Sequence, residues 1–275
     1  MVKRVTLVLS FFAAFLIINS QQAQAQWSLV GGVGATNYSG DISGVKIDHT
    51  RPALSLDLWY AIHPYFRWTV GVGAYQLYAK DTYEQRNRTF RANHYELNTT
   101  MMFIYDRNVA FAPYAYAGVG ITKVDPEGLV EDPTIGDWWF NIAEHEPENA
   151  SIPGHAFIIP VGVGVRYRFS PQFAVLLDGG LRISTSDFID GVSNKNINVS
   201  QLSGNARTYH EKIRPHGFGG KSTIRGGNPD VSDFYGIVSL KLQYIPRTYG
   251  HNSEYLRYRK RGKGKFRRRA GYISY

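Results

Sequence analysis

The sequence predicts an all-β fold, an eight-stranded antiparallel transmembrane β-barrel with short turns at one end, long loops at the other and a basic C-terminal tail. Three observations support it: long segments with a period of two, an N-terminal export signal, and no later apolar run of the 18 residues that a membrane helix needs. The 275 residues include 28 glycines and are 14% aromatic, a composition typical of all-β proteins.

The hairpin at residues 155–190 carries the clearest pattern. Its first arm places apolar residues from Phe157 to Phe169 on odd positions, with Gly and Arg between them, and its second arm repeats the pattern after a turn at 170–172. Each arm is longer than a typical soluble strand and close to the roughly 9 to 11 residues that a tilted strand needs to cross a bilayer. We therefore interpret the arms as two strands of a membrane barrel.

The N-terminus has the order of a secretory signal. Lys3 and Arg4 precede the apolar residues 5–18, and an Ala-Gln-Ala site ends at Ala25. We expect residues 1–25 to be a signal peptide, 26–245 the barrel and 246–275 a separate tail. The chain has no cysteine, which excludes disulfides, thiolate metal sites and a lipid anchor on cysteine.

Alternation predicts the remaining strands. In order, the eight strands are expected at residues 27–38, 53–62, 66–74, 94–105, 109–122, the two arms of the hairpin, and 234–244. Short turns should join the second to the third, the fourth to the fifth and the sixth to the seventh, with much longer loops elsewhere. In bacterial outer-membrane barrels short turns face the periplasm. We therefore expect a bacterial outer-membrane protein with both termini in the periplasm.

Charged residues alternate with the apolar ones, so they should face the barrel interior. They could line a conduction path or a proton relay, or they could be a paired ionic plug. Eight strands enclose a space that side chains fill, which favours the plug. The expected interior ionic network comprises Asp57, Arg67, Glu96, Arg166, Arg168, Asp178, Arg182 and Lys241.

The predicted long loops offer weak signals only. Residues 123–154 are acidic, but their spacing matches no calcium loop; the adjacent Trp138 and Trp139 suggest that part of this loop packs against something. Residues 219–223 imitate the end of a phosphate loop without its first glycine or a preceding strand. His145 and His155 are the only candidates for a hydrolase at the rim, and no spacing gives them a nucleophile. The sequence thus indicates no catalytic residue, metal or cofactor.

The tail holds ten basic residues and one acid, Glu254, a net charge of +9 that equals the formal charge of the whole chain. Nucleic acid is excluded as a partner in the periplasm, which leaves an acidic protein, peptidoglycan carboxylates or anionic lipid headgroups. Interleaved Tyr residues favour an ordered protein contact over a disordered tail. The basic residues are Arg247, Arg257, Arg259, Lys260, Arg261, Lys263, Lys265, Arg267, Arg268 and Arg269.

Several segments between residues 27 and 244 resemble, in order, the PorG barrels of the type IX secretion system of Bacteroidetes. The most specific are Tyr-x-Gly-Asp at residues 38–41 and Arg-x-Ser-x-Ser-Asp-Phe-Ile-Asp at 182–190, whereas the basic tail departs from the family. The resemblance implies a non-catalytic barrel that is associated through the periplasm with the ring and lipoprotein subunits of the secretion and gliding machinery.

The sequence therefore predicts an anchor, embedded in outer-membrane lipid, for periplasmic subunits of type IX protein secretion. Its expected contacts are the short turns and the tail. A small porin, which would use the inward charges, and a surface adhesin, which would use the acidic loop, are the alternatives. The expected partner-binding residues are His63, Pro64, Asp106, Arg107, Asn108, Ser170, Pro171, Gln172 and the tail cations from Arg257 to Arg269.

Overall fold

The computed structural model describes residues 27–40, 42, 44–81, 89–105, 111–130, 136–145, 151–170, 172–191, 196–202, 204–208, 223–225 and 233–246. The expected signal peptide (1–25) and nearly all of the tail lie outside these residues. Within them, no helix has the length and apolar character needed to cross a bilayer.

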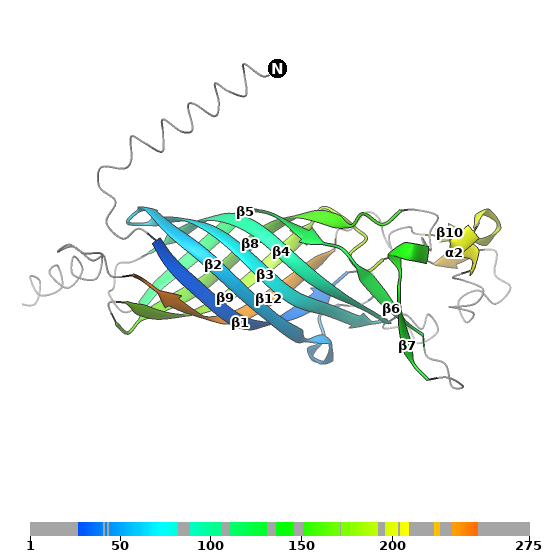
Figure 1. Cartoon of the computed structure of the whole chain (residues 1–275), viewed down its shortest axis with the longest axis horizontal. Coiled ribbons are helices and arrows are strands. Elements are labelled where there is room, and N and C mark those ends of the chain that lie inside the picture. Colours follow the sequence, from blue (N-terminus) through cyan, green and yellow to red (C-terminus); the bar gives the residue numbers. More distant parts are fainter. Residues whose placement is uncertain are drawn as a thin grey trace, which may run out of the picture.

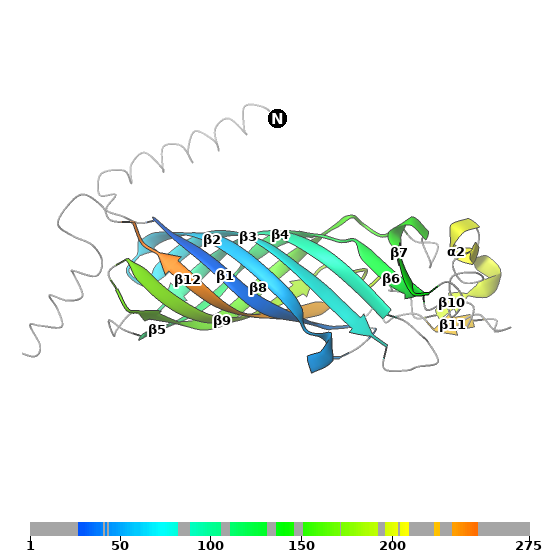
Figure 2. The same cartoon turned by 60° about the horizontal axis from the view of Figure 1, so that its bottom comes forward.

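Eight tilted strands form a closed antiparallel barrel, which confirms the predicted fold (Figures 1 and 2). Each strand pairs with the next barrel strand in the sequence, and β12 closes the circle by pairing with β1. The barrel strands are β1 (Trp27–Ser39), β2 (Arg51–His63), β3 (Phe66–Lys80), β4 (Thr89–Ile104), β5 (Phe111–Lys123), β8 (His155–Arg168), β9 (Phe173–Ser184) and β12 (Phe234–Tyr244).

The barrel has a turn end and a loop end. The turn end holds the connections β2–β3, β4–β5 and β8–β9 together with Trp27 and Tyr244, the outermost residues of β1 and β12. The loop end carries the hairpin of β6 (Pro126–Val130) and β7 (Trp138–Asn141), with β10 (Asn196–Asn198), β11 (Thr223–Arg225) and the short helix α2 (Gly204–Thr208) beyond it (Figure 1). Three single 3-10 turns, η2 (Ile47–His49), η4 (Ala143–His145) and η5 (Val199–Gln201), complete the loop end.

One sequence expectation about the loop end is wrong. β3 continues to Lys80 and β4 already begins at Thr89, so only eight residues separate these strands and no long loop joins them. The expected acidic loop at 123–154 contains β6 and β7, and β6 pairs with the outer part of β4. Side chains keep alternating between the two faces of β3, but beyond Ala74 the apolar and polar positions exchange. The inward Leu77 and Ala79 are apolar there, whereas the outward Gln76 and Lys80 are polar.

The outward face of the barrel is an apolar band with an aromatic girdle at the turn end. Aliphatic side chains such as Val33, Leu56 and Leu177 are exposed along the middle of the wall. Such a band bordered by aromatic residues is typical of a surface that faces lipid. The girdle consists of Trp27, Tyr65, Phe66, Trp68, Phe103, Tyr105, Phe111, Tyr167, Phe169, Phe173 and Tyr244.

Candidate functional site

The barrel interior collects the charged residues that alternation placed there. Because successive residues of a strand face opposite sides of the sheet, all eight face inward. Asp57, Arg67, Glu96, Arg166, Arg168 and Asp178 are buried, and the side chains of Arg182 and Lys241 are largely buried. Five of them form two clusters near the middle of the barrel, described below. Arg67 lies closer to the turn end, where it donates a hydrogen bond to the carbonyl of His63 at 2.9 Å. Arg166 is nearby in register, opposite Ala112 and Leu176.

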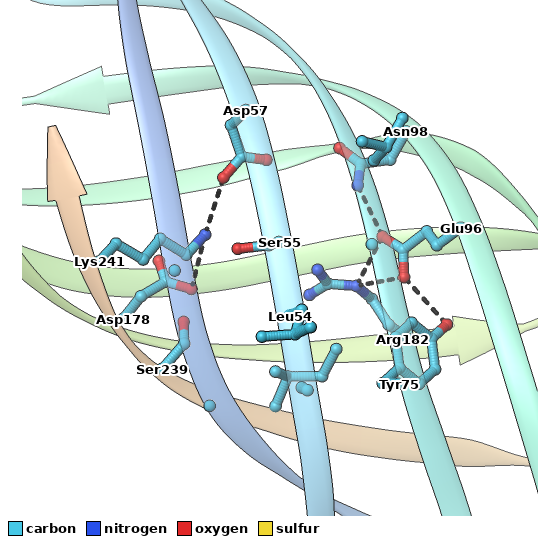
Figure 3. Close-up of a pocket in the computed structure, with 16 residues that line it drawn as sticks. Leu54, Ser55, Asp57, Tyr75, Glu96, Asn98, Asp178, Arg182, Ser239 and Lys241 are labelled. Carbon is cyan, nitrogen blue, oxygen red and sulfur yellow. Dashed lines mark hydrogen bonds and ion pairs between the residues drawn. The ribbon is translucent and has the colours of Figure 1, made fainter. Parts of the chain in front are cut away.

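The first cluster centres on Lys241 of β12. Its Nζ lies 3.2 Å from Oδ2 of Asp57 and 3.5 Å from Oδ1 of Asp178, so one cation bridges two acids (Figure 3). The hydroxyls of Tyr114 and Tyr116 donate to the two oxygens of Asp178 at 2.9 and 3.2 Å. These bonds offset much of the cost of removing the charges from water.

Lys241 reaches Asp57 across the intervening strand because that strand has a glycine at the crossing. Gly32 of β1 pairs with Lys241 on one side and with Ser55 on the other. A Cβ at Gly32 would lie 2.5 Å from Cγ of Lys241, a separation that side chains do not tolerate. The glycine therefore opens the space through which the lysine passes.

The second cluster centres on Glu96 of β4. Nε of Arg182 donates to both carboxylate oxygens at 3.1 and 3.2 Å, and the amide of Asn98 donates to Oε1 at 2.7 Å (Figure 3). The hydroxyl of Tyr75 donates to Oε2 at 3.0 Å and lies 2.5 Å from the hydroxyl of Tyr235. Glu96 thus has partners on both oxygens, as a buried carboxylate requires.

Two small cavities border these clusters, with volumes of about 30 and 20 Å³. Both are lined by the acids Asp57 and Asp178 and the cations Arg182 and Lys241. Spaces of this size hold at most a water molecule or two. Among the residues that the structure describes, these two cavities have room for isolated waters and none for a solute.

Packed side chains fill the interior on both sides of the two ionic clusters. The cluster toward the turn end, here the turn-end cluster, comprises Val30, Trp59, Met102, Ile104, Ala112, Tyr114 and Leu176. The cluster toward the loop end, here the loop-end cap, comprises Tyr38, Ile42, Ala53, Tyr75, Leu77, Ala79, Phe90, Ala92, Val124, Phe140, Ile142, Ile152, Ala156, Ile189 and Tyr235. The buried Arg67 and Arg166 are interleaved with the turn-end cluster, because Arg67 pairs in register with Met102, and Arg166 with Ala112 and Leu176. Apolar and cationic side chains therefore fill the turn end of the barrel together.

The loop-end cap joins the two sequence elements that carry the family resemblance. The hydroxyl of Tyr38 lies 2.9 Å from Oδ2 of Asp190 and 2.5 Å from Oδ1 of Asp233, and all three side chains are buried. The ring of Tyr38 packs edge-on against Phe90 at 5.0 Å. These contacts tie the end of β1 to the segment after β9 and to the start of β12, which gives both elements a structural role.

The expected partner-binding residues divide into two groups. His63 and Pro64 are exposed in the turn between β2 and β3, and the ring of His63 lies 5.7 Å from that of Tyr65. At the β8–β9 turn, Ser170 and Gln172 are described, and the Gln172 carbonyl accepts a hydrogen bond from the Ile245 amide at 2.8 Å. The remaining ones lie outside the described residues: Asp106, Arg107, Asn108, Pro171, Arg257, Arg259, Lys260, Arg261, Lys263, Lys265, Arg267, Arg268 and Arg269.

The rim residues are held by local packing. His145 lies 5.5 Å from the ring of Phe140, with Nδ1 2.9 Å from the carbonyl of Asn141. His155 is exposed at the start of β8. Trp139 is covered by the guanidinium of Arg91 at 4.2 Å, which supplies the packing partner expected for one of the two tryptophans. Among the described residues, no three His, Cys, Asp or Glu side chains gather as a metal site would require.

Sequence reasoning missed the interior tyrosines. Tyr114 and Tyr116 lie on the weakly patterned β5, opposite Gly164 and Gly162 of β8. A tyrosine across from a glycine can lie over the neighbouring strand and extend its hydroxyl into the barrel, so this pairing is the signal that would have found them.

Solved structures with a similar fold include outer-membrane and surface proteins. Neisserial surface protein A is 12% identical with a TM-score of 0.46, over 82% of this chain and 100% of that one. OprG of Pseudomonas aeruginosa is 13% identical with a TM-score of 0.41, over 82% and 99%. Ail of Yersinia pestis, solved with the heparin analogue sucrose octasulfate, is 10% identical with a TM-score of 0.38, over 79% and 97%.

No curated protein is significantly similar to this chain. The family model of the outer membrane protein beta-barrel domain matches residues 9–206, which is more than half of the chain. The sealed eight-stranded barrel with its apolar outer band therefore belongs to the outer membrane protein beta-barrel family.

Proposed function

We propose that this outer-membrane barrel is a non-conducting, non-catalytic anchor that holds periplasmic protein subunits at its turn end. The observation that carries the proposal is the filled interior, in which two ionic clusters lie between packed groups of buried side chains. A barrel without a solute path acts through its ends or its outer wall. This property favours an anchor over a small porin.

The turn end is the end that we assign to the periplasm. Short turns face the periplasm in bacterial barrels of this class. The chain leaves β12 at Tyr244, next to the β8–β9 turn, and the basic tail follows directly. With this orientation the tail, with its net charge of +9, follows β12 on the periplasmic side, the same end of the barrel that carries His63 and Pro64. Acidic surfaces of periplasmic proteins, peptidoglycan carboxylates and anionic headgroups are the partners that such a charge attracts.

The resemblance to PorG barrels supplies the specific form of the proposal. In this form, the partners are the periplasmic ring and lipoprotein subunits of a type IX secretion and gliding machinery. The closed barrel supports that role because an anchor needs a rigid body in the membrane and a contact surface beyond it.

A comparison of the full chain with a variant that stops after Tyr244 tests the proposal. Both proteins are purified from detergent extracts, co-purified proteins are identified, and secretion is assayed in the same strains. We expect ring or lipoprotein subunits to co-purify with the full chain and to be lost, together with secretion, on truncation. A variant in which Gln replaces the ten tail cations separates charge from the aromatic residues that it retains.

The outcomes discriminate between the contact surfaces. If the partner stays bound to the truncated barrel, the turns carry the anchor, and substituting His63 and Pro64 with Ala should then release it. If neither protein retains a periplasmic partner, the anchor proposal fails.

A surface adhesin is the second candidate, and the loop-end cap favours it. The cap has its own apolar core, and Trp138 of the β6–β7 hairpin remains exposed. Cells that produce a Trp138→Ser variant would lose attachment if this hairpin binds an external surface, whereas an anchor would tolerate the change.

A further inference from the structure

The connection between β1 and β2 folds back onto the outside of the barrel. The side-chain amide of Asn37 on β1 donates to the carbonyl of Lys46 at 2.5 Å, and the Lys46 amide lies 3.3 Å from Oδ1 of Asn37. The same Asn37 amide is 3.2 Å from the hydroxyl of Thr50. Residues 44–50, here the wall turn, therefore lie against the wall and project sideways from it as the small blue 3-10 turn in Figures 1 and 2.

A second set of contacts clamps the wall turn to β3. His49 is buried, its ring lies edge-on to Tyr78 at 5.5 Å, and its Nε2 is 3.4 Å from the amide of Lys80. The guanidinium of Arg51 covers the other part of Tyr78 at 3.9 Å from the ring centre. Because both sides are held, the direction in which the wall turn points is fixed by the barrel.

The two most apolar side chains of this clamped segment point away from the protein. Val45 is 70% exposed and Ile47 is 93% exposed, the highest value among the exposed large hydrophobic residues that the structure describes. Polar residues at these two positions would lose no packing contacts within the protein. Such exposure in a fixed segment marks a contact surface.

The lipid-facing band lies directly beside the wall turn. Asn37, which holds Lys46, is two residues from Ala35 on the outward face of β1, and the next outward residue is the exposed Val33. On the neighbouring strand the exposed Leu54 occupies the matching place, paired with Val33. Val45 and Ile47 therefore continue an apolar surface that already faces lipid.

Three cations lie in the wall turn or at its clamp. Lys46 lies between them in the sequence, and Arg51 and Lys80 lie at the clamp on β3. Within the described part of the chain, the acids nearby are Asp48, which is exposed, and Asp81, which is buried. Apolar side chains next to Lys and Arg are the composition expected where a protein meets the phosphate layer of a membrane.

We propose that the wall turn is a membrane foot, in which Val45 and Ile47 insert into the lipid leaflet at the loop end while Lys46, Arg51 and Lys80 contact lipid phosphate groups. The continuous apolar surface and the adjacent cations commit this surface to lipid. The foot fixes how deeply the barrel sits in the membrane and how the barrel is oriented around the clamped turn. It is independent of any periplasmic partner, so its failure would leave the anchor proposal intact.

The absence of native cysteine makes the test direct, since one introduced cysteine gives one labelled site. The full chain is prepared as Ile47→Cys, as Leu56→Cys within the apolar band and as Ser200→Cys in the exposed η5 turn. Each is labelled with an environment-sensitive fluorophore and reconstituted into phosphatidylcholine and phosphatidylglycerol vesicles. Brominated lipids serve as the quencher in the membrane and iodide as the quencher in water. The gel mobility of the folded barrel confirms that each variant has folded.

We expect the label at residue 47 to shift to shorter wavelength and to be quenched by lipids brominated near the headgroup, with less iodide quenching than at residue 200. The label at residue 56 should instead respond most to lipids brominated deep in the chain. If the label at residue 47 responds to iodide as fully as that at residue 200 and is insensitive to brominated lipid, the membrane foot is wrong.

The phosphate contact has its own readout. Replacing Lys46, Arg51 and Lys80 with Gln should reduce the quenching of the label at residue 47 by brominated lipid in vesicles that contain phosphatidylglycerol. The replacement should also abolish any decrease in this quenching that added salt causes. Equal quenching and equal salt response with and without the three cations would overturn the assignment of phosphate groups to them.

Discussion

The two halves of β3 have opposite polarity. From Phe66 to Ala74 the outward side chains are apolar and the inward ones include Arg67 and Thr69, whereas from Tyr75 to Lys80 the inward Leu77 and Ala79 are apolar and the outward side chains are mostly polar. The first half follows the rule of a lipid-embedded barrel, and the second half, whose outward side chains lie at the headgroup layer and beyond it, follows that of a soluble protein. One continuous strand thus crosses from one solvent to another.

This difference explains the strand lengths. β3 and β4 have 15 and 16 residues, more than the roughly 9 to 11 that a tilted strand needs for a bilayer. The excess forms the wall of the loop-end cap, whose core is apolar because water surrounds it. The ionic interior can be charged because side-chain partners, rather than water, satisfy its groups.

The largest effect should come from breaking the ionic interior. A Glu96→Ala substitution leaves Arg182 buried without its carboxylate, so we expect it to lower the free energy of unfolding by about 3–5 kcal/mol. Urea titration of the protein in vesicles, followed by tryptophan fluorescence, measures this loss. The double variant Glu96→Ala and Arg182→Ala should regain part of it. A loss well below 1 kcal/mol would mean that the ion pair is solvated.

The boundary between the two halves of β3 can be located by placing an arginine on either side of it. Val72→Arg puts a charge on the lipid face and should cost about 2–4 kcal/mol, while Gln76→Arg beyond the band should cost about 0–1 kcal/mol. The same urea titration compares the two variants. Equal costs would show that the band does not end between these positions.

The cap should respond locally. Tyr38→Phe removes the hydroxyl that Asp190 and Asp233 share, with an expected cost of about 1–3 kcal/mol. Because these hydrogen bonds join Tyr38 to Asp190 and Asp233 rather than to the two ionic clusters, amide exchange should accelerate in residues 185–191 and stay unchanged in the middle of β9. Uniform acceleration along β9 would contradict the separation of the two regions.

The smallest effect belongs to the exposed pair at the rim. The Lys123 ammonium donates to Asp125 at 2.5 Å, and together with the Asn141 amide this holds the pKa of Asp125 below its usual range. Both side chains of the pair are partly exposed, so Asp125→Asn should cost less than about 1 kcal/mol at pH 7. Because the pKa of Asp125 is lowered in the folded state, the pair stabilises the fold at pH values above the usual pKa of about 3.9. This stabilisation is lost as the pH falls through the lowered pKa. The difference between the two proteins in urea titrations should vanish at low pH, and a difference that grew instead would contradict the pairing.

The sequence predicted the lipid-embedded half well and the cap poorly. Alternation identified all eight barrel strands and turned residues such as Asp57 and Lys241 inward, because a period of two fixes the face of a residue without tertiary information. It ended the third strand at Ala74 because the pattern changes phase there. The partners of each charge also escaped prediction: Lys241 meets Asp57 across β1 only once the barrel has closed.

Conductance of the purified full chain in a planar bilayer tests the central claim, that the interior is closed. With packed side chains filling the barrel on both sides of the ionic clusters, we predict no discrete conductance steps in concentrated salt, and no swelling of vesicles that carry the barrel when a small sugar is added outside. Stable ohmic steps that disappear in a Lys241→Met variant would contradict the account, because they would show ions passing through the charged interior that these side chains fill.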